Sequence, residues 1–340
     1  MRAVKIVDAK KMEVTEIEDV TPRRDSVVIK VNSCGICGSD IHYWVSGEPK
    51  GLVMGHEFSG EVVDPGDRND LRIGQRVTGL PISSCMVCEA CKSGNPQFCR
   101  NTWTEAVGLS LDNPGGYAEY IRCRGDMVRK IPDSVTDDEA AMVEPSAVSL
   151  HAVNLANIKV GQSVLIVGGG IIGLMSVEFA KLNGASKVVL LETNEKRGKK
   201  ALTYGKVDEY YDAKDSNVVP MLVEKTGGFD VVIECCGSTP AVSEAIMGVK
   251  PGGTIVLVGV ATEPITIPTV VAVMGEVKMQ GAIAYTPKEF DDCIELIANK
   301  KIDVEKYIDA RVGLDEAQHS FERLTSGEDD AIKIILKPQI

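Results

Sequence analysis

The stretch Ser163-Val-Leu-Ile-Val-Gly168-Gly-Gly170-Ile-Ile-Gly173 decides the fold of the second half of this 340-residue chain. An apolar run ends at a glycine turn, and the helical stretch Leu174 to Asn183 follows directly. This order predicts a strand, a turn and a helix that together bind the pyrophosphate of a dinucleotide. The first glycine allows the tight turn, the second lets the phosphates approach, and the third lets helix and strand pack closely. The expected cofactor-binding residues of the turn are Gly168, Gly170, Ile172 and Gly173.

An acidic residue follows the next apolar run. Lys187-Val-Val-Leu-Leu191 ends at Glu192, nineteen residues after Gly173. A carboxylate in this place accepts hydrogen bonds from the adenosine ribose and repels a 2′-phosphate, so we expect NAD rather than NADP. Arg197 lies five residues further on, where it either flanks the adenosine or faces solvent.

The pattern along the chain changes near residue 150. Before it, short β-like runs such as Ser26–Val31, Gly60–Val63, Gln75–Thr78 and Tyr117–Ile121 are separated by Gly, Pro and Asp, which predicts a β-rich, barrel-like domain. After it, apolar runs such as Asp230–Glu234 and Thr254–Val258 alternate with helical stretches. Such runs are typical of strands buried on both faces of a parallel sheet. A helix over Pro287–Lys300 and a strand over Ala331–Leu336 are expected to return to the first domain.

Charge and hydropathy exclude some classes of partner. The formal net charge is −12, which disfavours nucleic acid and anionic membranes. No apolar run approaches the roughly 20 residues of a membrane span. The N-terminus, Met1-Arg-Ala-Val-Lys-Ile-Val7, is predicted to be a strand and not a signal peptide. We therefore expect a cytoplasmic protein with reduced cysteines.

Four cysteines are concentrated in one short segment, Cys85, Cys88, Cys91 and Cys99. Two two-residue gaps and a seven-residue gap can wrap four sulfurs around one zinc ion. Gly94 and Pro96 provide the turn in the last gap. Four protein ligands leave no open position, so the sequence predicts a structural zinc ion rather than a catalytic one. Dense spacing in a cytosolic chain favours a metal over disulfides.

A second metal site can be assembled from the first domain. Cys34-Gly-Ile-Cys37-Gly-Ser39-Asp40-Ile-His42-Tyr43 gathers thiol, hydroxyl, carboxylate and imidazole groups, and Gly55-His56-Glu57 and Glu144-Pro145 follow. A thiolate, an imidazole and a carboxylate are suitable zinc ligands, and three of them leave the fourth position open for a substrate. Asp40 is a plausible partner for the second ring nitrogen of His56.

In this order the motifs resemble those of the zinc-dependent medium-chain dehydrogenase/reductase superfamily, in its polyol (sorbitol) and 2,3-butanediol dehydrogenase branch. The likeness covers essentially the whole chain and includes Gly115-Gly-Tyr-Ala-Glu119. It implies an α/β protein with the active site in a cleft between two domains. The implied parts are a GroES-like β-rich catalytic domain over residues 1–147 with a zinc lobe at about 83–102, a Rossmann domain with a doubly wound parallel sheet over 148–284, and a C-terminal segment, 285–340, that returns to the catalytic domain.

The resemblance also implies roles for single residues. Cys37 and His56 would bind the catalytic zinc, with either Glu57 or Glu144 as the third ligand. The zinc would lower the pKa of the substrate hydroxyl, and hydride would pass to the nicotinamide. Ser39 would hydrogen-bond the alcohol, and His42 would hand its proton to solvent. The nicotinamide end would be held around Val258, Gly259, Val260, Ala282, Ile283 and Ala284.

The substrate is less clear from the sequence. Tyr43 and Tyr285 are expected to line its site. Polyol dehydrogenases often have an arginine just before the second tyrosine, whereas this chain has Ala284, which is more similar to 2,3-butanediol dehydrogenases. The loop between His42 and Gly55 is shorter than those enzymes usually have. We therefore expect a secondary hydroxyl of a vicinal diol or polyol to be oxidised to a ketone.

Three alternatives stay open. An L-threonine-type or a simple secondary-alcohol dehydrogenase would use the same motifs. A zinc-free reductase leaves Cys37, His56 and Glu57 unexplained. A non-catalytic NAD-binding protein would need only the structural ion. The resemblance further implies a homodimer or homotetramer, for which Ile265–Met274 is a candidate contact, although it could also be an ordinary buried strand and helix start.

Overall fold

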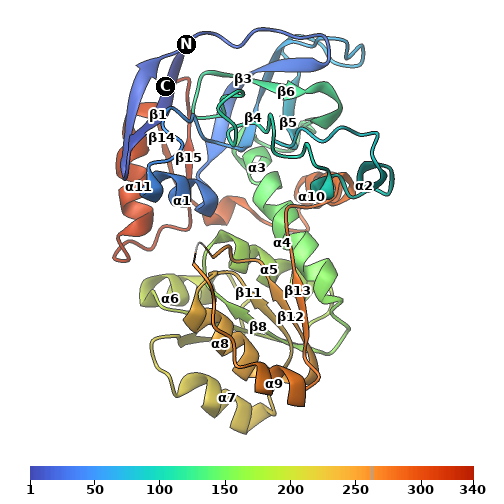
Figure 1. The fold of residues 1–340 in the computed structure, drawn as a ribbon, viewed down its shortest axis with the longest axis vertical. Coiled ribbons are helices and arrows are strands. Elements are labelled where there is room, and N and C mark those ends of the chain that lie inside the picture. Colours follow the sequence, from blue (N-terminus) through green and yellow to red (C-terminus); the bar gives the residue numbers. More distant parts are fainter. Residues whose placement is uncertain (262) are drawn as a thin grey trace. The chain divides into compact units, whose positions relative to one another are not determined.

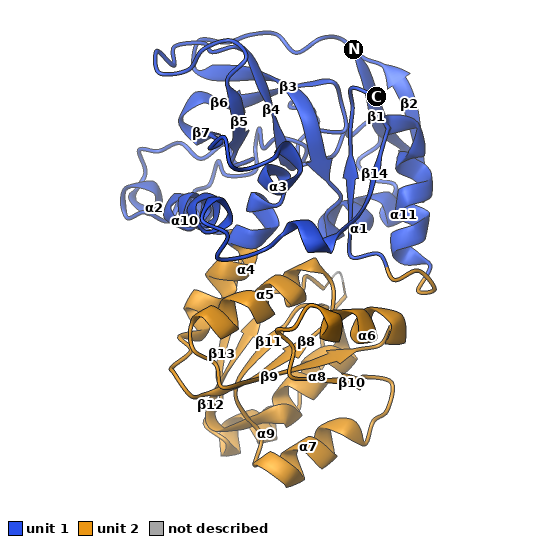
Figure 2. Cartoon of the chain, turned by 180° about the vertical axis from the view of Figure 1, so that it is seen from behind, with its two compact units in different colours: residues 1–147, 285–326, 331–340 blue, residues 148–284, 327–330 orange. Residues whose placement is uncertain are grey.

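The computed structural model describes residues 1–261 and 263–340. Within these residues the chain divides into two compact units, which Figure 2 colours separately. Unit 1 comprises Met1–Ala147, Tyr285–Ser326 and Ala331–Ile340, and unit 2 comprises Val148–Ala284 and Gly327–Asp330. No helix formed by the described residues combines the length and the hydropathy that a membrane span requires.

Unit 1 is built on a mainly antiparallel sheet, with seven strands among the described residues, and a separate hairpin of β1 and β2. The central strand, β3, pairs with β4 along most of its length, with β6 near its start and with β15 at its end. The C-terminal segment thus completes the sheet that the N-terminal segment begins (Figure 1). The strands are β1 (Arg2–Asp8), β2 (Lys11–Glu16), β3 (Ser26–Gly35), β4 (Glu57–Asp64), β5 (Arg76–Gly79), β6 (Tyr120–Arg124), β7 (Val128–Lys130), β14 (Ile308–Val312) and β15 (Lys333–Leu336).

Local capping explains where several helices of this part of the chain begin. Thr136 starts α3 and Thr286 starts α10, each in a capping box with the glutamate three residues later. The helices are α1 (Gly38–Ser46), α2 (Glu89–Lys92), α3 (Asp137–Ala141), α4 (Val143–Ala156), α10 (Pro287–Ala298) and α11 (Ala317–Thr325), with short 3₁₀ turns η1 (Pro96–Phe98), η2 (Gly125–Met127), η3 (Glu305–Tyr307) and η4 (Leu314–Glu316).

Unit 2 is a parallel sheet with helices, and its described residues form six strands in the order β10-β9-β8-β11-β12-β13. The order reverses between β8 and β11, and such a reversal is where doubly wound sheets bind ligands. The strands are β8 (Ser163–Val167), β9 (Lys187–Glu192), β10 (Glu209–Asp212), β11 (Phe229–Glu234), β12 (Val249–Leu257) and β13 (Lys278–Gly281). The helices are α5 (Ile171–Leu182), α6 (Glu195–Thr203), α7 (Val218–Thr226), α8 (Thr239–Gly248) and α9 (Thr269–Met274).

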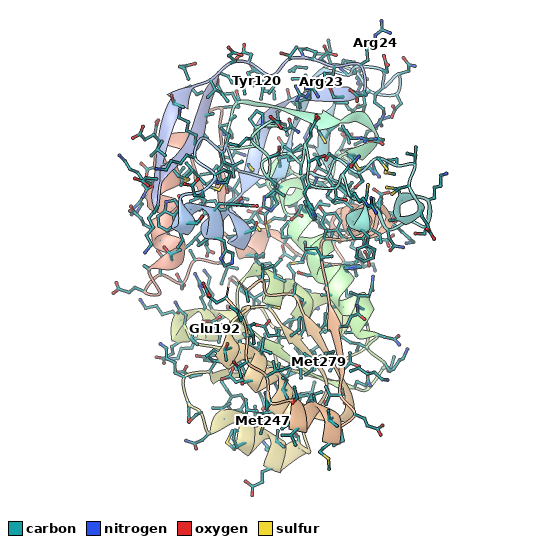
Figure 3. The ribbon with its side chains drawn as sticks, in the orientation of Figure 1. Arg23, Arg24, Tyr120, Glu192, Met247 and Met279 are labelled. Carbon is teal, nitrogen blue, oxygen red and sulfur yellow. The ribbon has the colours of Figure 1, made fainter. Side chains whose placement is uncertain are left out.

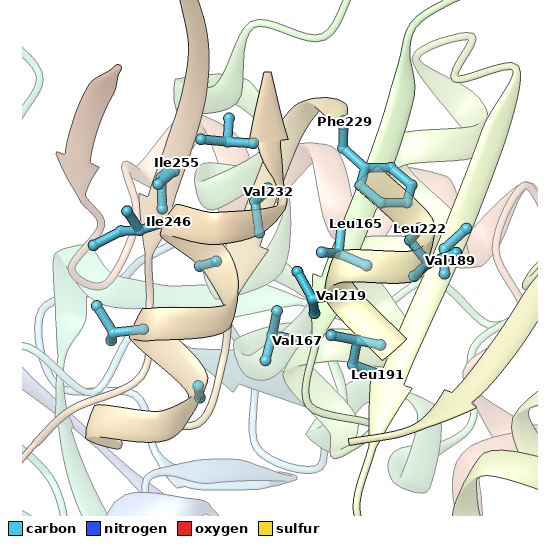
Figure 4. Packing of buried hydrophobic residues seen from close by; sticks show 14 of the residues in the cluster. Leu165, Val167, Val189, Leu191, Val219, Leu222, Phe229, Val232, Ile246 and Ile255 are labelled. Atoms are coloured by element: carbon cyan, nitrogen blue, oxygen red, sulfur yellow. The ribbon is translucent and has the colours of Figure 1, made fainter. Parts of the chain in front are cut away.

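The apolar runs of the sequence form the core of unit 2. Leu165 and Val232 project from neighbouring strands against Leu222 of α7 and Ile246 of α8 (Figure 4), and all four side chains are at most 1% exposed. Burying apolar surface at about 25 cal/mol per Å² is the main force that holds these helices on the sheet.

Most of the expected strands are present, with two differences. The run predicted to start at Tyr117 becomes a strand only at Tyr120, where pairing with β3 begins, because the backbone of Tyr117 bonds Met54 and Val4 instead. The alternative of an ordinary buried strand in Ile265–Met274 is wrong. Residues 265–268 form no strand, and α9 buries none of its residues.

Candidate active site and cofactor site

One site of unit 1 collects a thiol, an imidazole and a carboxylate. Cys37 precedes α1, two residues after β3 ends, and His56 and Glu57 stand where β4 begins. The antiparallel register places Gly35 of β3 opposite Glu57, so both segments reach the same end of the sheet. One ligand atom from each of Cys37, His56 and Glu57 lies within 4.8 Å of the other two.

These three residues fit a zinc ion. Oε1 of Glu57 is buried and has no hydrogen-bond partner in the described part of the chain. A buried carboxylate oxygen without a partner costs free energy, and a cation beside it would remove that cost. Thiolate, imidazole and carboxylate are established zinc ligands, and a set of three leaves one tetrahedral position open.

Asp40 connects the segments that carry these ligands. Its Oδ1 lies 3.4 Å from Nδ1 of His56, as the sequence led us to expect. Its Oδ2 accepts hydrogen bonds from the backbone N–H of Cys37 at 3.0 Å and from the hydroxyl of Tyr117 at 2.7 Å. Burial alone would lower the pKa of His56, but the negative charges of Asp40 and Cys37 outweigh it and raise the pKa.

Sequence reasoning missed two residues that lie next to the three-ligand group and Asp40. Tyr117 lies in a motif used only for the family resemblance, and its position in the chain does not show that it reaches Asp40. Lys333 of β15 is fully buried, and its Nζ donates to Oε2 of Glu57 at 2.6 Å. The sequence did contain one signal for Lys333, which is the single lysine inside the apolar run Ala331–Leu336. A lysine in a buried strand requires a partner, so this pattern could have indicated a buried ion pair.

Glu144 of α4 is not a member of the three-ligand group. Its Oε1 accepts a hydrogen bond from the hydroxyl of Tyr285 at 2.9 Å, and both side chains are buried. Burial raises the pKa of Glu144 to about 7, against the opposing effect of His56. The structure therefore pairs Tyr285, expected to line the substrate site, with the second candidate ligand.

The expected relay residues lie along the start of α1. Oγ of Ser39 donates to Sγ of Cys37 at 3.3 Å, so this hydroxyl is next to the three-ligand group. His42 is exposed and Tyr43 is half-buried. Trp44 is buried and packs against Phe321 of α11, with ring centroids 5.7 Å apart, which fixes α1 on the unit.

The four-cysteine segment folds around η1 and α2. Sγ of Cys88 lies 3.5 Å from Sγ of Cys91, and Sγ of Cys99 lies 3.6 Å from Sγ of Cys85. One sulfur from each of the four lies within 4.8 Å of the others. Backbone N–H groups of Val87 and Cys88 point at the Cys85 sulfur and lower the pKa of its thiol to about 6. A thiolate is the form that binds zinc, so the donor set fits a closed four-sulfur zinc site.

The glycine turn of unit 2 has the geometry that its spacing predicts. Gly168 has a φ of +105°, a conformation that side chains disfavour. A Cβ on Gly170 would meet no atom within 4 Å, so the space in front of the turn is open. A Cβ on Gly173 would lie 1.9 Å from the carbonyl oxygen of Gly168, so only glycine lets α5 approach β8 this closely.

Glu192 (labelled in Figure 3) stands beside this turn at the end of β9. Its Oε2 accepts from the N–H of Gly169 at 2.6 Å, and its Oε1 accepts from the N–H of Asn194 at 2.7 Å. These bonds fix the carboxylate next to the glycines and leave it further lone pairs. Arg197 is half-buried on α6, and its backbone N–H bonds the capping side chain of Asn194.

The two segments expected to hold the nicotinamide follow neighbouring strands of the same sheet. Residues 258–260 follow β12, and residues 282–284 follow β13. The N–H of Ala282 donates to the carbonyl of Leu257 at 2.9 Å, which ties the two segments together. Val260 and Ile283 are exposed, so both segments offer apolar surface at the carboxyl end of the sheet.

Comparisons with known proteins agree with this architecture. Residues 23–133 match the family "Alcohol dehydrogenase GroES-like domain", and residues 172–299 match "Zinc-binding dehydrogenase". The chain is 32% identical over 344 residues to sorbitol dehydrogenase of Bombyx mori, covering 98% of this chain and 96% of that protein. It is 32% identical over 327 residues to L-threonine 3-dehydrogenase of Rhizobium johnstonii, covering 93% and 92%.

Solved structures extend the likeness over the whole chain. A putative zinc-binding dehydrogenase from Sinorhizobium meliloti bound to NADP is 32% identical, with a TM-score of 0.87 and 99% coverage of both chains. The 2R,3R-butanediol dehydrogenase from Bacillus subtilis is 28% identical, with a TM-score of 0.86 and 99% coverage of both.

The fold and the donor sets define a two-part, zinc-dependent dehydrogenase with a GroES-like domain and a Rossmann domain. The chain belongs to the zinc-dependent medium-chain dehydrogenase family, whose members act on CH–OH groups.

Proposed function

We propose that the protein is an NAD-linked oxidoreductase that interconverts a secondary alcohol, in a vicinal diol or polyol, and the corresponding ketone. The observation that carries this proposal is the group of Cys37, His56 and Glu57, whose ligand atoms lie within 4.8 Å of one another. Three protein ligands leave the fourth tetrahedral position of a zinc ion open for a substrate. A closed site would indicate a structural role, as in the four-cysteine segment.

In this proposal Cys37, His56 and Glu57 hold the catalytic zinc, and Cys85, Cys88, Cys91 and Cys99 hold the structural zinc. Glu57 is preferred to Glu144 because its Oε1 is the buried oxygen without a partner, whereas Glu144 is engaged by Tyr285. When bound, the catalytic zinc acts as a Lewis acid that lowers the pKa of a substrate hydroxyl. Glu144 stays the alternative third ligand.

The chain's own residues handle the proton. In this proposal the Ser39 hydroxyl, adjacent to Cys37, hydrogen-bonds the alcohol and relays its proton, and the exposed imidazole of His42 hands the proton to solvent. Imidazole is the side chain that most often transfers protons in enzymes.

Glu192 supports NAD as the cofactor. Its carboxylate is held at the glycine turn by two backbone N–H groups, where a 2′-phosphate would meet a fixed negative charge. The relative bound to NADP, together with Arg197 of this chain, makes NADP the second candidate. The preference is tested by the kcat/KM for NAD divided by that for NADP, measured in wild type and in Glu192→Ala. This ratio should be lower in the variant.

The substrate class rests on the relatives and on two residues. Ala284 precedes Tyr285, so this position lacks the guanidinium fork that could bind several hydroxyls. Tyr43 is the second proposed substrate residue. An L-threonine-type activity is the alternative, because a threonine dehydrogenase is as similar to this chain as a sorbitol dehydrogenase is. A simple secondary-alcohol dehydrogenase is a further candidate.

We also propose a cytoplasmic homo-oligomer. The ten cysteines form no disulfide in the described residues. A reducing compartment keeps thiols in this form. Val270, Val273 and Met274 of α9 are 67–81% exposed and could be covered by a second copy of the chain. Light scattering at micromolar concentration would return the 36.5 kDa monomer mass if this is wrong.

The deciding experiment measures metal content and NAD-linked oxidation of 2,3-butanediol, sorbitol, L-threonine and 2-propanol, in wild type and Cys37→Ser. We expect two zinc ions and turnover of a diol or polyol in wild type, and one zinc and no turnover in the variant. Turnover of threonine or 2-propanol alone would replace the substrate proposal. One zinc in wild type, unaffected by Cys37→Ser, would refute the catalytic site and favour a non-catalytic NAD-binding protein.

A further inference from the structure

Lys333 is the fully buried lysine of unit 1, and its side chain is 0% exposed. Its Nζ makes two hydrogen bonds, to Oε2 of Glu57 at 2.6 Å and to the backbone carbonyl of Ile36 at 2.8 Å. Ile36 directly precedes Cys37, so the lysine holds together the two segments that carry metal-ligand candidates. A lysine almost never becomes fully buried without such partners.

The strand register explains how a residue near the C-terminus reaches this place. β15 pairs with the end of β3, with Ile335 opposite Gly35, and β4 pairs with the other edge of β3, with Glu57 opposite Gly35. Lys333 and Glu57 therefore come from the two strands that flank Gly35.

Gly35 provides the space in which the lysine and the carboxylate meet. A Cβ at this position would lie 2.0 Å from Oε2 of Glu57. The carboxylate therefore lies across a strand position that has no side chain, and any larger residue there would displace it from Lys333. The steric limit at Gly35 is a separate observation from the hydrogen bonds of Lys333, and both involve Oε2 of Glu57.

The two oxygens of Glu57 have different surroundings. Oε2 accepts the bond from Lys333, whereas Oε1 is buried without a partner among the described residues. We propose that Lys333 is a positioning residue that holds Oε2 of Glu57 over Gly35. It thereby turns Oε1 toward the metal ion that Cys37 and His56 would also bind. This inference deepens the proposed function and rests on it, since it takes Glu57 as the third ligand.

Two partners explain why a lysine suits this role. The bonds to Oε2 of Glu57 and to the backbone carbonyl of Ile36 hold Nζ in one place, so it can act as a fixed donor. Groups that orient metal ligands typically contribute 10–100-fold to metal affinity.

The test uses cobalt(II) as the metal in full-length protein. Affinity at the candidate catalytic site is measured by chelator competition, and geometry by the visible absorption of bound cobalt, while the four-cysteine site serves as an internal control. The variants are Lys333→Met, Gly35→Ala, Glu57→Gln and the double variant K333M/E57Q. Lys337→Met is the matched control, because it removes a lysine from the same segment that bonds Ser33 and Asp138 instead.

We expect Lys333→Met and Gly35→Ala each to weaken cobalt binding about 10–100-fold and to shift its absorption spectrum, with the four-cysteine metal retained. Lys337→Met should bind like wild type. In the Glu57→Gln background, removing Lys333 should add less than about threefold, since its effect passes through Glu57.

Wild-type affinity and spectrum in both Lys333→Met and Gly35→Ala would overturn the proposal, as would an equal loss with and without Glu57. If Lys333→Met does not fold, the decision rests on Gly35→Ala and on K333M/E57Q, which leaves no unpaired buried charge. Failure of the proposed function looks different, because Cys37→Ser would then also leave the metal count unchanged.

Discussion

Tyr117→Phe tests whether the second carboxylate of the site, Asp40, is held in place by a distant hydroxyl. The tyrosine is fully buried and donates to Oδ2 of Asp40 at 2.7 Å. Asp40 in turn lies 3.4 Å from Nδ1 of His56. Phenylalanine keeps the ring, including its edge contact with Phe321 at 6.1 Å, and removes only the hydroxyl.

The expected size of the effect follows from these contacts. A hydrogen bond to a charged group contributes about 1.5–3 kcal/mol, and Oδ2 would keep only the N–H of Cys37. The free energy of unfolding of the metal-free protein should therefore fall by about 1.5–3 kcal/mol. A less firmly held Asp40 orients His56 less well, so zinc affinity should fall by about tenfold, the lower end of the usual range.

The assay combines two measurements on the same samples. Urea unfolding of metal-free protein reports the stability change, and zinc release to a chelator reports the affinity of each site. Tyr211→Phe is the control, because it removes a tyrosine hydroxyl that donates to Glu209 at 2.9 Å in unit 2. It should leave the zinc affinity of both sites at the wild-type value.

Two outcomes would refute the reasoning. Loss of stability with unchanged zinc release would make Tyr117 a purely structural residue. Unchanged stability would show that the bond to Asp40 contributes nothing in the folded protein.

Three further results are expected. Gly173→Ala puts a Cβ 1.9 Å from the carbonyl oxygen of Gly168, so NADH affinity measured by fluorescence should fall at least tenfold, whereas metal content should not change. Cys99→Ser should remove the structural zinc and lower the thermal midpoint, with cobalt still bound at the other site; loss of both metals would contradict separate sites. Asp138 bonds Ser33, Lys337 and Arg311, and although burial raises its pKa, these partners outweigh burial and lower it. A lowered carboxyl pKa stabilises the fold above about pH 4 and ceases to do so as pH falls through the folded-state pKa. Asp138→Asn should thus cost on the order of 1 kcal/mol at pH 7, and the difference should close in unfolding experiments as pH falls through the lowered folded-state pKa; a difference independent of pH would refute this.

The candidate metal and cofactor residues were accessible to sequence reasoning because they lie in short local motifs. The spacing of four cysteines within fifteen residues limits their sulfurs to one small volume, and the structure brings them within 4.8 Å. The third ligand of the other site was not accessible in this way. Glu57 and Glu144 both follow suitable motifs, and only the surroundings of their carboxylates distinguish them.

The sequence by itself determined the class of this protein, the glycine turn beside β8 and the set of four cysteines, since each depends on residues close together in the chain. The third ligand of the other site stayed open between Glu57 and Glu144. Tertiary structure alone decided which residues hold those ligands. Tyr117 is 77 residues from Asp40, and Lys333 is 276 residues from Glu57. Such pairs form because strand register and burial bring separate segments together, and spacing along the chain carries no record of that register.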